Sequence, residues 1–296
     1  MKKPVFTGAS VAIVTPFTAD NKIHFEEFGK MIDFQIENGT DAITVCGTTG
    51  ESACMTDDEH RECIEYCVDR VAGRVPVIAG TGSNDTAYAI ELSKHAAKAG
   101  ADALLLVTPY YNKTTQKGLI KHYNMIADAV DVPCILYNVP SRTGCGFTVD
   151  TYKELSKHEN INGVKEASGN FSLILDTMAA CGDDLNVWSG NDDQVVPMLA
   201  LGAKGVISVV SNILPAEMHQ MCAEFFAGNI AKAAELQKKY CDITNALFCE
   251  VNPIPAKTAL GLLGWDVGEL RMPLCEMSDA NLARLKNSMA AIGLLK

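Results

Sequence analysis

The sequence predicts an α/β protein of the (β/α)8 TIM-barrel class with a C-terminal helical extension. The chain has 296 residues, which suits a barrel of about 250 residues with room for an extension. Short segments recur along it that are apolar on both faces, as parallel strands covered by helices are. These eight predicted strands span residues 9–15, 42–45, 75–79, 103–107, 133–137, 163–165, 187–189 and 205–209.

A doubly wound sheet is the competing architecture. Sheets of that kind carry a glycine-rich turn after the first strand, where the backbone approaches a dinucleotide. The corresponding segment here reads Thr15-Pro16-Phe17-Thr18 and lacks those glycines. The sequence therefore favours the barrel.

Four helices between the strands have their own sequence signals. Thr56 and Glu59 have the spacing of a capping box. The helix expected over 86–99 ends at Gly100, and Thr148 caps the helix that follows the fifth strand. The first helix is marked by an apolar stripe at helical spacing and a glycine that suits its end: Phe25, Phe28, Ile32, Ile36 and Gly39.

Strand signals stop after the eighth segment, and the rest of the chain is expected to be wholly helical. Pro215 begins this part, with breaks at Gly228 and at 252–255, and the last helix is expected over 278–291. The predicted domains are a catalytic barrel over residues 1–225 and a C-terminal helical domain over residues 226–296.

Composition narrows the class of partner. The net charge of −11 argues against nucleic acid, which needs clustered Lys and Arg. No apolar run is long enough for a signal peptide or a membrane span, so we expect a cytoplasmic protein. None of the 11 cysteines forms Cys-x-x-Cys, and Cys63 and Cys67 are expected to be buried thiols in a reducing compartment. No metal-ligand or nucleotide motif is present.

In barrels the active site lies at the carboxyl ends of the strands. One lysine, one arginine and several hydroxyls follow the predicted strands there. Lys165 ends the sixth strand, where loss of water favours the neutral amine that attacks carbonyl groups. The alternatives are a lysine that extends its amine into solvent or one that pairs with Glu166.

Three neighbouring features favour the catalytic interpretation. Tyr137 ends the fifth strand, one strand away from Lys165, and can relay protons; its alternative is a core aromatic residue. The turn 47–50, Gly-Thr-Thr-Gly, can present backbone N–H groups and two hydroxyls to a small carboxylate, or its threonines can bond only locally. Arg142 is a second carboxylate ligand, or a solvated loop arginine.

These motifs together resemble the pyruvate-dependent class I lyases and, more narrowly, the dihydrodipicolinate synthase family. The likeness covers nearly the whole chain, from about Thr7 to the C-terminal helices. The segments that carry it are Gly47-Thr48-Thr49-Gly50-Glu51, Thr108-Pro109-Tyr110-Tyr111-Asn112, Tyr137-Asn138-Val139-Pro140-Ser141-Arg142-Thr143-Gly144 and Gly163-Val164-Lys165-Glu166-Ala167-Ser168.

The resemblance implies that Lys165 forms an imine with pyruvate, without a metal or other cofactor. It implies that Thr48 and Thr49 hold the pyruvate carboxylate, and that Gly190 and Ile207 line the pyruvate site.

The resemblance also implies a proton relay in which Thr49 links Tyr137 to Tyr111. In the family that second tyrosine is usually lent by a neighbouring subunit, which implies a homo-oligomer, commonly a tetramer. Arg142 would position the carboxylate of L-aspartate 4-semialdehyde, the partner of pyruvate in lysine and diaminopimelate synthesis.

A lysine-binding regulatory site is a further implication. Lysine-inhibited members commonly have a histidine in the capping-box turn and a glutamate in the helix after strand three, where this chain has Asp57 and Tyr88. We therefore expect no strong inhibition by lysine. The remaining positions of that site match the pattern: Ser52, Ala53, His60, Asn84 and Tyr110.

Two alternatives to this function stay open. One keeps the imine and changes the aldehyde, as in N-acetylneuraminate lyase or a keto-deoxy sugar acid aldolase; Arg142 argues against it, because those relatives usually lack it. The other is a non-catalytic barrel that binds a keto acid or lysine, which the intact set of site residues disfavours.

Overall fold

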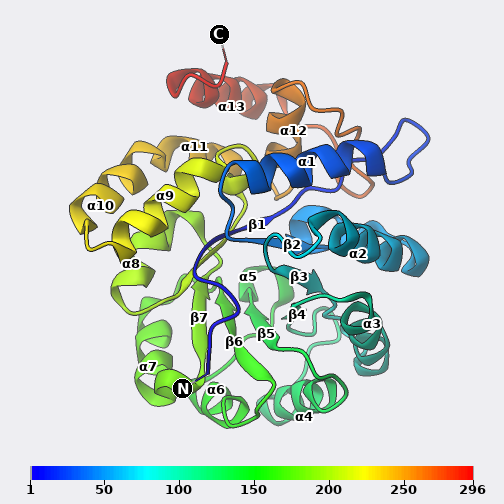
Figure 1. Ribbon diagram of the computed structural model, residues 1–296, viewed down its shortest axis with the longest axis vertical. Helices are drawn as coiled ribbons and strands as arrows, with labels where there is room; N and C mark the ends of the chain where they lie inside the picture. Colours follow the sequence, from blue (N-terminus) through cyan, green and yellow to red (C-terminus); the bar gives the residue numbers. More distant parts are fainter. Residues whose placement is uncertain (1, 296) are drawn as a thin grey trace.

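The computed structural model of the protein describes residues 2–295 and contains a closed barrel of eight parallel strands (Figure 1). Each strand pairs with the next along the chain, and β8 pairs with β1. All eight predicted strands are confirmed, with shifts at several ends. The strands are β1 (Gly8–Ala12), β2 (Ala42–Val45), β3 (Val77–Gly80), β4 (Ala103–Val107), β5 (Cys134–Asn138), β6 (Ile161–Glu166), β7 (Asn186–Ser189) and β8 (Gly205–Ser208).

Helices cover the barrel from outside, and the predicted helix ends are confirmed. The Thr56–Glu59 capping box is complete, Gly100 follows the last residue of α3, and Thr148 caps α6. The helices of this layer are α1 (Phe25–Glu37), α2 (Asp57–Val71), α3 (Thr86–Ala99), α4 (Gln116–Ala127), α6 (Val149–Leu155), α7 (Phe171–Cys181), α8 (Val195–Ala200) and α9 (Pro215–Phe226), and the short α5 (Pro140–Thr143) follows the end of β5.

The barrel interior is filled by side chains of the strands and the N-terminal segment. Phe6 stacks on Trp188 with ring centres 5.2 Å apart, and the indole N–H donates to the Phe6 carbonyl. The same cluster contains Leu105, Tyr137 and Ile207. The interior is therefore a packed core, and chemistry is confined to the strand ends.

The chain after α9 forms the extension; its last three helices lie at one end of the molecule in Figure 1, and its first helix lies beside α9. Its helices are α10 (Ile230–Lys239), α11 (Cys241–Leu247), α12 (Ile254–Leu262) and α13 (Asp279–Ala291). The described part of the chain also contains five 3-10 turns: η1 (Thr48–Gly50), η2 (Ser52–Cys54), η3 (Gly182–Asp184), η4 (Asp192–Gln194) and η5 (Val210–Asn212).

The expectation of a wholly helical C-terminal part is wrong for residues 264–278, which contain no helix. This segment lies against the barrel, where Phe17 N–H donates to the Val267 carbonyl at 3.0 Å. Gly268 has φ +65°, and a Cβ there would lie 1.9 Å from the Phe17 carbonyl oxygen. The close contact fixes an extended path that helical periodicity does not reveal.

The cysteines match the expectation of free thiols. All 11 are free, and Cys63 and Cys67, on the inner face of α2, are completely buried. Within residues 2–295, no group of three or more His, Cys, Asp or Glu side chains is arranged to hold a metal ion. In the same range, no helix is both long and apolar enough to cross a membrane.

Candidate active site

Lys165 and Tyr137 lie side by side at the carboxyl ends of β6 and β5. The two residues are register partners in the parallel ladder, so their side chains point to the same face of the sheet. Both are buried, with 5% and 7% of their surfaces exposed. The Lys165 Nζ lies 4.5 Å from the centre of the Tyr137 ring. The predicted adjacency of amine and tyrosine is therefore present.

Glu166 does not pair with Lys165, so that alternative is wrong. Successive strand residues face opposite sides, and the Glu166 carboxylate points away from the barrel interior. There it accepts hydrogen bonds from Asn138 Nδ2 at 2.9 and 3.1 Å, from the Tyr152 hydroxyl at 2.7 Å and from Ser168 N–H at 2.7 Å. These four bonds satisfy the carboxylate and tie the end of β6 to β5.

Gly190 closes against the stem of Lys165. A Cβ at this position would lie 3.1 Å from Lys165 Cε and 2.7 Å from the Ala167 Cβ. Ile207, on β8, is fully buried in the interior cluster that also contains Tyr137. Gly190 is therefore adjacent to Lys165, and Ile207 shares the interior cluster with Tyr137; that both line a pyruvate site stays a prediction.

The Gly-Thr-Thr-Gly segment forms the single turn η1. Gly50 N–H donates to the Gly47 carbonyl at 3.1 Å. The amides of Thr48 and Thr49 come first in the turn, where N–H groups have no partner within a helix. The Thr49 hydroxyl is buried and accepts a hydrogen bond from Asn252 Nδ2 at 3.0 Å.

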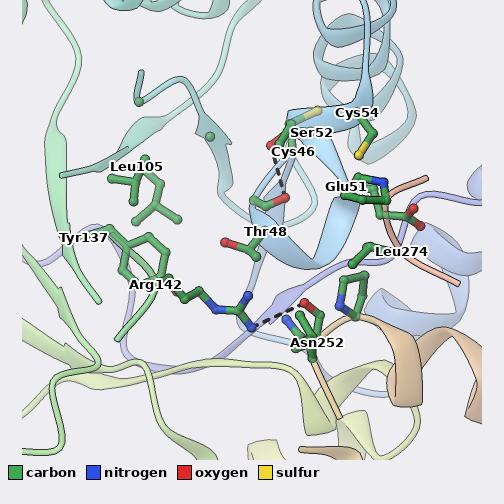
Figure 2. A pocket seen from close by; sticks show the side chains of 18 residues that line it. Cys46, Thr48, Glu51, Ser52, Cys54, Leu105, Tyr137, Arg142, Asn252 and Leu274 are labelled. Atoms are coloured by element: carbon green, nitrogen blue, oxygen red, sulfur yellow. Dashed lines mark hydrogen bonds between the residues drawn. The ribbon is translucent and has the colours of Figure 1, made fainter. Parts of the chain in front are cut away.

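A cavity of about 260 Å³ lies between this turn, β5 and the C-terminal extension. Thr48, Tyr137 and Arg142 line it, together with Asn252. Figure 2 shows the Arg142 side chain extending toward Asn252, whose backbone carbonyl accepts a hydrogen bond from Nη2 at 3.3 Å. One exposed guanidinium thus lies at the wall of the cavity, on α5, directly after β5.

Tyr111 is the predicted site residue that the single chain leaves apart. It follows β4 with φ +66°, and 94% of its surface is exposed. It is not among the residues that line the cavity, and neither are four other predicted active-site residues: Lys165, Thr49, Gly190 and Ile207.

The predicted regulatory residues lie beside the same loops. Ser52 donates to the Gly47 carbonyl at 3.3 Å, and Asn84 Nδ2 donates to the Tyr110 carbonyl at 3.2 Å. His60 is buried, with Nε2 2.8 Å from the Gly80 carbonyl oxygen, and its pKa is lowered chiefly by burial. Ala53 lines the cavity.

The two departures from the regulated pattern contact each other. The Tyr88 hydroxyl donates to Asp57 Oδ1 at 2.8 Å, and Arg61 Nε donates to Asp57 Oδ2 at the same distance. Burial, followed by the bond to Asp57, raises the pKa of Tyr88 to about 12. The Asp57 carboxylate is thus occupied by its own neighbours.

Sequence reasoning missed three groups near the site. Asn252 reaches Thr49 and Arg142 from the extension, and Lys257 pairs with Glu51 at 2.8 Å next to η1. The only sequence signal of Asn252 is its place in a helix break, and that of Lys257 is its place in an otherwise apolar helix.

Asp192, after β7, is the third group. Its carboxylate is buried, and burial raises the pKa of this group. Hydrogen bonds from Ser208 and two backbone amides, together with the charge of Lys165, oppose this rise. Asp192 follows the strand-end sequence Ser-Gly-Asn in a rim that was predicted to be polar.

The fold and the site define a (β/α)8-barrel protein that carries a buried lysine against a tyrosine at its strand ends. A model of the dihydrodipicolinate synthetase family matches residues 5–292, and the protein belongs to that family.

Its relatives extend over the full length of the chain. It is 53% identical over 294 residues to the 4-hydroxy-tetrahydrodipicolinate synthase of Thermoanaerobacter sp. (strain X514), with 99% of each chain covered. The structure of dihydrodipicolinate synthase from Aquifex aeolicus matches with a TM-score of 0.96 at 45% identity, covering 98% of this chain and 99% of that one. The Cyanidioschyzon merolae enzyme with lysine bound matches with a TM-score of 0.96 at 42% identity, covering 99% and 100%.

Proposed function

We propose that the protein catalyses the 4-hydroxy-tetrahydrodipicolinate synthase reaction, in which pyruvate condenses with L-aspartate 4-semialdehyde through an imine at Lys165. The observation that carries this proposal is the buried Lys165 amine, 4.5 Å from the ring centre of Tyr137 at the strand ends of the barrel. The names of relatives that are about half identical over their full length support the same reaction.

The first half of the reaction forms the imine. The neutral Lys165 amine attacks the C2 carbonyl of pyruvate, and the resulting carbinolamine loses water after its hydroxyl is protonated. Tyr137 gives and takes the protons, because a hydroxyl beside the amine can do both. The pyruvate carboxylate binds at the start of η1, to the amides and hydroxyls of Thr48 and Thr49, with Gly190 and Ile207 beside the methyl group.

The second half uses the enamine. Loss of a proton from the pyruvate methyl group gives a carbon nucleophile, which attacks the aldehyde of the second substrate. Water, or the amino group of the aspartate semialdehyde part as it closes the ring, then attacks the imine carbon and displaces the Lys165 amine. Arg142 is suited to the carboxylate of aspartate semialdehyde, since a guanidinium binds a carboxylate by two parallel hydrogen bonds. No step calls for a metal or an organic cofactor.

An oligomer completes the proposed relay. The side chain of Tyr111 is exposed in the single chain, so it is free to enter the site of a second copy and to contact Thr49 there. We propose a homo-oligomer on this basis. A homotetramer and a cytoplasmic location are proposed from the resemblance to the family. The division into domains 1–225 and 226–296 remains a prediction.

Lysine is proposed to be a weak inhibitor at most. A relative was solved with lysine bound, and the corresponding site here would use Ser52, Ala53, His60, Asn84 and Tyr110. Tyr88 has a hydroxyl where regulated members have a carboxylate, and this hydroxyl is bonded to Asp57. The lysine ammonium would therefore lack its carboxylate partner.

Turnover with different aldehydes tests the proposal. Aspartate semialdehyde should be used with a far higher kcat/KM than N-acetylmannosamine or glyceraldehyde, and Arg142→Ala should lose most of that preference. Equal use of the sugar aldehydes by the wild-type protein would mean that it is a sugar-acid lyase. The same assay with added lysine should show at most a small loss of rate.

A further inference from the structure

Asn252 joins the two loops that carry the proposed carboxylate ligands. It lies between α11 and α12 in the C-terminal extension and is 5% exposed. Its Nδ2 donates to the Thr49 hydroxyl at 3.0 Å. Its backbone carbonyl accepts from Arg142 Nη2 at 3.3 Å, the bond drawn in Figure 2. Thr49 and Arg142, the proposed ligands of the two substrate carboxylates, therefore both contact Asn252, which lies about 200 positions after Thr49 in the chain.

The bond to Thr49 limits what that hydroxyl can do. A threonine hydroxyl has one hydrogen and two acceptor lone pairs. The Asn252 amide occupies one lone pair, which leaves one acceptor position and the hydroxyl's own hydrogen. A group that passes a proton needs one of each. The amide thus removes the competing orientations of the hydroxyl and leaves the pair that a relay uses.

The other amide atom argues against a purely structural role. Asn252 Oδ1 is buried and has no hydrogen-bond partner among the atoms of residues 2–295. A buried acceptor without a partner destabilises the folded state, and an apolar side chain would avoid that cost. The residue is therefore better explained by the contact its Nδ2 makes.

A buried ion pair keeps Asn252 in register with the turn. Lys257, on α12, donates to Glu51 Oε1 at 2.8 Å, directly after η1, and both side chains are almost fully buried. The extension and the turn are thus joined at two points, Asn252–Thr49 and Lys257–Glu51.

We propose that Asn252 is a positioning residue that orients the Thr49 hydroxyl for proton transfer and holds it in register with Arg142. The inference rests on the proposed function and adds to it a role for the C-terminal extension. Asn252 does not touch the reacting atoms; it acts through Thr49.

A double-mutant cycle on kcat/KM for pyruvate tests the proposal, with Asn252→Ala, Thr49→Val and the double variant. Asn252→Ala should lower kcat/KM by about 10- to 100-fold, as a small misplacement of a catalytic group does. Thr49→Val removes the hydroxyl itself and should lower kcat/KM at least as much. The kcat/KM of the double variant should lie within about threefold of that of the less active single variant, because both changes remove the same contact. Asn245→Ala, an exposed asparagine of α11, is the matched control and should keep full activity.

Asn252→Asp provides the same cycle if the alanine variant does not fold. It conserves shape, but its ionised carboxylate cannot donate to Thr49. If the fold losses in kcat/KM of the two single variants multiply in the double variant, the positioning role of Asn252 is overturned and the proposed catalytic function is unaffected. A wild-type protein that forms no borohydride-trapped pyruvate adduct would overturn the proposed function, and this inference with it.

Discussion

The Lys257–Glu51 pair offers the sharpest prediction about stability. The two side chains are 2% and 0% exposed, and their charged atoms are 2.8 Å apart. Lys257 also donates to the Glu269 carbonyl at 2.8 Å, and Arg271 N–H donates to the other Glu51 oxygen at 2.9 Å. Burial lowers the pKa of Lys257, although the charge of Glu51 opposes this shift. Among the described residues, the Lys257 ammonium is the only cation that forms an ion pair with Glu51.

Lys257→Met keeps most of the side-chain volume and removes the charge. Glu51 Oε1 then loses its donor, and the carboxylate remains buried with a single backbone N–H. Breaking a buried pair in this way costs about 3–5 kcal/mol of unfolding free energy. Because Glu51 follows η1 directly, the KM for pyruvate should rise as well.

Urea denaturation at one fixed protein concentration measures the stability loss. The double variant Glu51→Gln/Lys257→Met should recover most of it, since no unpaired charge stays buried. Lys22→Met removes a lysine from an exposed pair with Asp20 and should leave the urea midpoint unchanged. A Lys257→Met midpoint equal to that of Lys22→Met would refute the reasoning.

Three further predictions concern the site and the pH dependence. Tyr137→Phe keeps the ring against Lys165 but removes the hydroxyl, so kcat should fall by about 10²- to 10⁴-fold; an unchanged kcat would exclude Tyr137 as proton donor. Gly190→Ala places a methyl group 3.1 Å from Lys165 Cε and should reduce the yield of the reduced pyruvate adduct, measured by mass spectrometry. Burial lowers the pKa of His122 from 6.5 to about 4, so the unfolded chain binds more protons between these values. Stability should therefore be complete above about pH 6.5 and fall by up to about 3 kcal/mol toward pH 4, a loss that His122→Asn should largely remove in urea titrations.

The fold was predictable because local signals and tertiary structure agree for most of the barrel. Strands buried on both faces are uniformly apolar, and α3 begins and ends where its sequence signals place it. The segment 264–278 was not predictable in this way. Its path depends on contact with Phe17, including Gly268 against the Phe17 carbonyl and the Arg271 guanidinium 4.0 Å from the centre of the Phe17 ring. Periodicity carries no information about such contacts.

The site shows the same division. The meeting of Lys165 and Tyr137 follows from parallel pairing of neighbouring strands, so it could be inferred from chain order. Asn252 could not, because it reaches Thr49 from a helix break in the extension. Helical periodicity describes the flanking helices and does not indicate which barrel loop the break contacts.

Borohydride reduction in the presence of pyruvate tests the central claim most directly. Peptide mass spectrometry of the treated protein should find one reduced pyruvyl group per chain, on Lys165 alone, and Lys165→Met should abolish it. Lys257 is the internal control, because it is a second buried lysine that is already held in an ion pair. An unmodified Lys165, or a pyruvyl group on another lysine, would contradict the proposed imine mechanism.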